Sequence, residues 1–187
     1  LLEHHRSMAA GGVGLTTVAY GAVAKVGRTL PNQVWMRAEI LPDLKALAGA
    51  VHAEGGAISY QLTHGGSFVT SVKIEGPTMS ASGGFNKAGF MRGNFFQRAM
   101  TRADMDLVIG QFVDAAELCA QAGFDAVEIH MGHGYLLNQF ISPLSNKRRD
   151  EYGGSAENRA RFPAEVLRRV KAEVGQRMAV LAKINVA

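Results

Sequence analysis

Polar side chains that could take part in catalysis lie at the carboxyl ends of three short apolar runs of the sequence. They are Gln61 with His64, His130 with His133 and Tyr135, and Lys183 with Asn185. Packing of a core would favour valine or leucine at such places. In parallel α/β architectures, functional groups collect just past the carboxyl ends of the strands. The coincidence therefore predicts one shared chemical site at that end of a parallel sheet.

The run His130-Met-Gly-His133-Gly-Tyr135 is the densest of these groups. Residues three apart on a strand point to opposite faces, so both histidines can share a pocket only if the strand ends near Met131 and the chain turns. The two glycines of the run make that turn easy. Two imidazoles could then bind one carbonyl oxygen and stabilise charge that develops on it. The phenol of Tyr135 could deliver a proton.

Two other interpretations of the histidines stay open from the residues alone. They could be structural and bind loop carbonyls. A His-x-x-His pair could also hold zinc, but it lacks a third protein ligand at convincing spacing. We therefore expect no metal.

Gln61 and Lys183 suggest a polar ring ligand. The amide of Gln61 has both a donor and an acceptor, which could pair with the imide-like edge of a flavin. A cation at Lys183, inside the apolar run Val-Leu-Ala-Lys-Ile, could favour an anionic reduced flavin. A strand-end glutamine bound to backbone, a lysine whose head reaches solvent and a Schiff-base lysine are the alternatives. Tyr20 ends another run and could line the same site through its backbone.

Composition narrows the class of protein. The chain has 187 residues, 47% of them hydrophobic and 19% charged, with a net charge of +4. No apolar run reaches the roughly 18 residues that a membrane span needs, and the first residues do not resemble a signal peptide. The basic residues are scattered, which argues against a nucleic-acid partner. The single cysteine, Cys119, excludes an internal disulfide, and we expect a cytoplasmic protein.

Short apolar runs alternate with longer amphipathic stretches, which is typical of βα units around a parallel sheet. We expect strands at residues 14–20, 57–62, 126–131 and 178–186. Helices are expected from Pro42 to residue 55, from a cap at Thr101 to Gly123, and after a cap at Ser155. Pro163 predicts a kink or a restart in the last of these helices.

The stretch from about residue 63 to 100 is rich in glycine and serine and is long for a loop. We expect a lid or hairpin there. Its aromatic residues would serve as anchors, and they are Phe85, Phe90, Phe95 and Phe96.

Four strands are too few for a closed eight-stranded barrel, which needs about 250 residues. We therefore expect residues 1–187 to be a fragment of a single barrel domain, with the lid as an insertion.

Two long segments carry a family resemblance. Residues 123–143, which include the His130 to Tyr135 run, and residues 145–159, Ser-Asn-Lys-Arg-Arg-Asp-Glu-Tyr-Gly-Gly-Ser-Ala-Glu-Asn-Arg, closely resemble the old yellow enzyme (NADH:flavin oxidoreductase) family. Shorter matches lie at residues 11–15, 52–55, 61–64 and 76–78. The resemblance covers essentially the whole chain.

The resemblance implies an α/β fold, here part of a (β/α)8 barrel that binds FMN. It implies that NAD(P)H reduces the flavin, after which hydride passes from flavin N5 to an activated alkene such as an α,β-unsaturated carbonyl compound. Tyr135 would protonate the product, and His130 and His133 would hold the substrate's oxygen. The flavin contacts would be Gln61, Lys183, Tyr20 and His130.

The family pattern also places the first strand before Leu1 and the last three strands, with most phosphate-binding loops, after Ala187. This chain alone should then bind FMN poorly, and the full-length protein is expected to be a homo-oligomer. Alternatives on the same barrel are amine demethylation and dienoyl-CoA reduction, with further domains after the barrel. A flavin-free lyase that uses Lys183 and a non-catalytic remnant are the alternatives from other classes.

Overall fold

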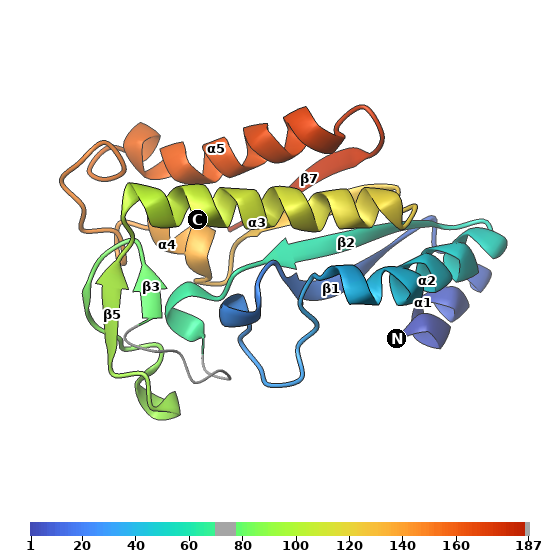
Figure 1. The fold of residues 1–187 in the computed structure, drawn as a ribbon, viewed down its shortest axis with the longest axis horizontal. Coiled ribbons are helices and arrows are strands. Elements are labelled where there is room, and N and C mark those ends of the chain that lie inside the picture. Colours follow the sequence, from blue (N-terminus) through green and yellow to red (C-terminus); the bar gives the residue numbers. More distant parts are fainter. Residues whose placement is uncertain (70–77, 186–187) are drawn as a thin grey trace.

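The computed structural model describes residues 1–69 and 78–185 and is built around a parallel sheet (Figure 1). Its strands, in spatial order, are β1 (Leu15–Ala22), β2 (Ala57–Thr63), β6 (Ala126–Met131) and β7 (Ala179–Ile184). All three neighbouring pairs are parallel. The four predicted strands are confirmed, except that Val186 of the last prediction lies outside the described residues.

Helices precede and connect these strands. They are α1 (Leu2–Ala10), α2 (Leu41–Ala53), α3 (Arg102–Gln121), α4 (Leu136–Ile141) and α5 (Ala156–Val174), with short 3-10 turns η1 (Lys25–Gly27), η2 (Ala38–Ile40), η3 (Gly66–Phe68) and η4 (Phe90–Arg92). The core lies between α2, α3 and α5 and one face of the sheet, where Tyr60, Phe112 and Phe162 are fully buried. No helix among the described residues is long and apolar enough to cross a membrane.

The helix starts follow the predicted caps. The Thr101 hydroxyl accepts from the Asp104 amide and the Asp104 carboxylate accepts from the Thr101 amide, which is a complete capping box. Ser155 caps α5 through the Asn158 amide. We expected a kink or a restart at Pro163; the restart is wrong, because α5 is one continuous helix. Its buried face packs on α3 and α4 on both sides of the proline, which offsets the lost hydrogen bond.

The expected lid is a small second sheet at the carboxyl end of the parallel sheet (Figure 1). We call residues 64–100 the excursion. Within it, β3 (Thr78–Ser80) pairs in parallel with β5 (Phe96–Ala99), and β4 (Gly84–Phe85) pairs antiparallel with β5. Residues 70–77, and with them most of the family match at 76–78, lie outside the described residues.

The prediction that phenylalanines anchor the excursion is wrong. Their side chains stack on one another and are about half exposed, the four being Phe85, Phe90, Phe95 and Phe96. The buried anchor is polar instead. Asn86, which has no exposed surface, donates to the Ser67 carbonyl at 2.8 Å and to the Thr78 hydroxyl at 3.1 Å, and accepts from the Gly89 amide. An amide can satisfy three backbone and side-chain groups at once, which a phenyl ring cannot.

Candidate active site

One face of the parallel sheet carries the predicted polar residues. Tyr60 and Ile129 point into the helical core, so their strand neighbours Gln61, Glu128 and His130 point to the opposite face. The strand register pairs Gln61 with Glu128 and His130 with Lys183. Paired residues of parallel strands lie on the same face, so these four side chains share it.

The turn that the sequence requires after Met131 is present. Strand β6 ends at Met131, and His133 (φ 55°) and Gly134 (φ 74°) adopt the left-handed conformation that reverses the chain. The turn brings the two rings together, with His133 Nδ1 lying 3.1 Å from His130 Nε2. The Gly132 amide donates to His130 Nδ1 at 3.3 Å, so His130 carries its proton on Nε2 and donates it to His133. His133 is then left with an N–H at Nε2 on its exposed side.

His130 is held neutral. It is 1% exposed, and burial lowers its pKa to about 4, with the charges of His133 and Lys183 adding to the effect. A neutral imidazole with a fixed tautomer is a hydrogen-bond donor rather than an acid near pH 7.

Tyr135 lies at the centre of this cluster. Its ring centroid is 5.2 Å from that of His130 and 5.7 Å from that of Phe68, both in edge-to-face contact. Its hydroxyl lies 2.7 Å from the Tyr20 hydroxyl. The structure thus brings together His130, His133 and Tyr135, as predicted, and adds Tyr20 through its hydroxyl rather than through its backbone as expected.

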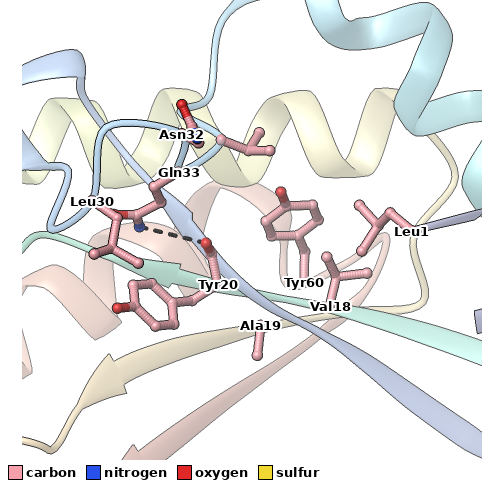
Figure 2. A pocket seen from close by; sticks show the side chains of 9 residues that line it. Leu1, Val18, Ala19, Tyr20, Leu30, Asn32, Gln33 and Tyr60 are labelled. Atoms are coloured by element: carbon pink, nitrogen blue, oxygen red, sulfur yellow. Dashed lines mark hydrogen bonds between the residues drawn. The ribbon is translucent and has the colours of Figure 1, made fainter. Parts of the chain in front are cut away.

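A chain of hydroxyl groups runs from Tyr135 into the loop after β1. The Tyr20 hydroxyl lies 2.8 Å from the Thr29 hydroxyl, and both the amide and the hydroxyl of Thr29 donate to Gln33 Oε1, at 2.7 and 3.2 Å. Gln33 Nε2 in turn donates to the Tyr20 carbonyl at 3.4 Å (Figure 2). A carbonyl oxygen only accepts, so one assignment satisfies these contacts: Tyr135 donates to Tyr20, which donates to Thr29. We call this chain the hydroxyl relay.

Glu128 is a site residue that was not predicted. Gln61, which is 4% exposed, donates from Nε2 to Glu128 Oε1 on the neighbouring strand. A carboxylate only accepts, so this bond fixes which way the Gln61 amide faces. Its carbonyl oxygen is directed away from Glu128. The signal was available, because Glu128 alternates with His130 on one strand face.

Gln139 in α4 was also missed, and it holds the Tyr135 loop in place. Its Nε2 donates to the carbonyls of Gly134 (2.6 Å) and Gly65 (3.2 Å), and its Oε1 accepts from the Ser67 amide and the Ser80 hydroxyl. One buried amide therefore ties the loop before Tyr135 to the end of β2 and to the excursion.

Lys183 and Asn185, the third predicted group, lie close in space to the group of His130 and His133. Lys183 is exposed beside His130, and the Asn185 side chain accepts from the His133 amide at 3.4 Å. His64, by contrast, is not in the site. It is 2% exposed, lies under Gly27 and accepts at Nδ1 from the Gly66 amide. Burial lowers its pKa to about 4.

A metal centre gains no support from the geometry. Within residues 1–69 and 78–185 there is no cluster of three or more histidine, cysteine, aspartate or glutamate side chains that could hold an ion. The two histidines bond each other instead.

The model of the NADH:flavin oxidoreductase / NADH oxidase family matches residues 1–187. The chain belongs to that family.

Curated relatives match this chain over nearly all of its length. The chain is 38% identical over 189 residues to a 4,4'-dithiodibutanoate disulfide reductase of Rhodococcus erythropolis, covering 100% of this chain and 45% of that protein. It is 39% identical over 170 residues to an NADPH dehydrogenase of Geobacillus sp. (strain WCH70), covering 90% and 48%. The chain therefore spans about half the length of the curated relatives it matches.

A solved structure agrees. The Old Yellow Enzyme from Pichia sp. AKU4542 superposes with a TM-score of 0.85 at 32% identity, over 97% of this chain and 50% of that one. The α/β fold described here is thus part of the barrel of the NADH:flavin oxidoreductases, an oxidoreductase family that uses FMN with NAD(P)H as reductant.

The residues present fit FMN. The sheet face that carries Gln61 and Lys183 offers the fixed carbonyl and second N–H of Gln61 and the ammonium of Lys183, whereas both ring nitrogens of His130 are already bonded, to the Gly132 amide and to His133. The groups of Gln61 and Lys183 are the donor, acceptor and cation that a flavin's pyrimidine edge requires.

Proposed function

We propose that this chain supplies the reacting half of an FMN-dependent enzyme that uses NAD(P)H to reduce the C=C bond of activated alkenes, such as α,β-unsaturated carbonyl compounds. The observation that carries the proposal is the cluster of His130, His133 and Tyr135 on the same face as Gln61 and Lys183. It offers the one remaining imidazole N–H, that of His133, as a hydrogen-bond donor to the substrate's oxygen, and the phenol of Tyr135 as a proton donor to its carbon.

Each side chain has a defined part. The His133 Nε2 proton binds the carbonyl oxygen of the substrate, and His130 holds His133 in the tautomer that presents that proton. Tyr135 gives its proton to the α-carbon. Bound FMN supplies the hydride that reaches the β-carbon. Gln61 and Lys183 hold the pyrimidine edge of the ring.

The visible spectrum of the full-length protein tests the proposal. A yellow protein that NADPH bleaches without oxygen, and that cyclohex-2-enone restores with formation of cyclohexanone, is the expected result. Full-length protein that purifies without flavin would contradict FMN as the cofactor. Bleaching by NADPH that no enone reverses would contradict activated alkenes as the substrate.

Disulfide reduction is the second candidate, favoured by the likeness to the dithiodibutanoate reductase over the whole chain. In that reaction the two electrons of the reduced flavin and two protons convert one disulfide into two thiols. Adding 4,4'-dithiodibutanoate to the bleached protein and counting thiols distinguishes the two substrates. The single buried cysteine fits a cytoplasmic location for either reaction, which cell fractionation would test.

A further inference from the structure

A hollow of about 380 Å³ lies between the excursion and the segment that follows α4. We call it the excursion pocket. Phe68 and Gly134 form part of its wall, and Phe68 packs edge-to-face on Tyr135. Its volume is within the range of small-molecule sites, which is about 300–1,000 Å³. The excursion pocket therefore adjoins the candidate active site and is large enough for part of a ligand.

The charges around the excursion pocket have one sign. Lys87 comes from the excursion and Lys147 from the segment after α4, and no described residue that lines the pocket is acidic. Both lysines are exposed. Lys147 is held by the protein, since its ammonium donates to the Pro143 carbonyl at 2.7 Å and its amide donates to the Ser82 hydroxyl. An ammonium has three protons, so further protons remain for a ligand.

The neutral polar groups of the lining serve the protein itself. Asn138 accepts from the Gly134 amide, Ser145 donates to the Gln139 carbonyl, and Gln97 donates to the Ser82 carbonyl. The lysines are therefore the groups that would select a ligand. Apolar side chains flank them, with Phe85 at 53% and Leu144 at 86% exposure.

Exposed apolar side chains beside a pocket with two cations suit an organic stem that ends in an anion. We propose that the excursion pocket binds such an anionic arm, a carboxylate or a phosphate, while the reacting end of the same molecule lies at Tyr135. The arm can belong to the alkene substrate or to the nicotinamide coenzyme. The inference rests on the proposed function only for the position of the reacting end.

The test is the double variant Lys87→Gln/Lys147→Gln of the full-length protein. Titration calorimetry with 4-phenylbutanoate and 4-phenylbutan-1-ol, which share a stem and differ in charge, measures the subsite without turnover. Each exposed ion pair contributes about threefold in affinity, so with two lysines we expect the protein to prefer the carboxylate by about tenfold. The double variant should lose that preference. The matched control is Lys45→Gln/Lys171→Gln, which removes the same charge from exposed positions on α2 and α5.

Kinetics then identifies the source of the arm. If the substrate supplies it, the double variant raises KM about tenfold for 4-carboxycinnamaldehyde and leaves KM for cinnamaldehyde and NADPH unchanged. If the coenzyme supplies it, KM for NADPH rises instead. Equal binding of the carboxylate and the alcohol, with both KM values at the level of the control variant, would overturn the proposal. A preserved carboxylate preference in a protein that reduces no alkene would keep the pocket and refute the proposed function.

Discussion

Replacing Tyr20 with phenylalanine removes one hydroxyl from the hydroxyl relay and leaves the ring in place. When Tyr135 gives up its proton, its oxygen becomes an anion 2.7 Å from the Tyr20 hydroxyl, which then turns from Thr29 to donate to it. A hydrogen bond to a charged group contributes about 1.5–3 kcal/mol, and Tyr135 is only half-buried, so the lower figure applies. About 1.4 kcal/mol changes a rate tenfold. We therefore expect Tyr20→Phe to slow proton delivery by about tenfold.

Stopped-flow absorbance of the full-length protein separates the two half-reactions. Reoxidation of the reduced flavin by cinnamaldehyde should slow by about tenfold in Tyr20→Phe and by about 10²–10⁴-fold in Tyr135→Phe. Reduction by NADPH needs neither hydroxyl and should keep its rate. Tyr60→Phe is the control, because Tyr60 points to the other face of the sheet. Equal slowing of both half-reactions by Tyr20→Phe would mean that the hydroxyl only supports flavin binding, and an unchanged reoxidation rate would mean that the relay does nothing.

Three further changes are predicted. Glu128→Gln should weaken FMN binding about tenfold, because an amide at position 128 can both donate and accept and so no longer fixes the direction of the Gln61 amide. Flavin fluorescence measures the binding. The control Glu117→Gln, on the surface of α3, should leave FMN binding unchanged. Burial lowers the pKa of His64 from 6.5 to about 4, so the unfolded chain takes up a proton first as the pH falls. His64 alone should lower the free energy of unfolding by about 2 kcal/mol between about pH 7 and pH 5. His64→Asn should remove that share of the drop in urea titrations, while the share of His130, whose pKa burial lowers in the same way, remains. Gln139→Ala breaks four hydrogen bonds and should cost about 3–4 kcal/mol in the same titrations, whereas an unchanged stability would refute its structural role.

The parallel sheet could be predicted because its strands are continuous apolar runs bounded by glycines and polar residues. The grouping of His130, His133 and Tyr135 followed from the same runs, since the carboxyl ends of parallel strands meet at one edge. Their tautomers and the bond between the rings could not be predicted, because both depend on the Gly132 amide and on the exact path of the turn.

Other parts escaped the sequence for physical reasons. The helix α4 has six residues, too few to show a helical period, so Gln139 had no visible partners. His64 was grouped with Gln61 by proximity, although a period of two already placed them on opposite faces. The stacked phenylalanines of the excursion were expected inside because aromatic residues usually are. That expectation holds for a core and not for a small sheet that packs through Asn86.

The four bonds of Gln139 make the Tyr135 loop and the excursion one mechanical unit. A ligand that shifts β3 also shifts Gln139, because the Ser80 hydroxyl donates to its side chain. Gln139 in turn bonds the Gly134 carbonyl, directly before the proton donor Tyr135. Occupancy of the excursion pocket and alignment of the Tyr135 phenol would then be thermodynamically linked, each favouring the other. Natural variation in the excursion could accordingly retune which molecules react without altering a single strand of the barrel.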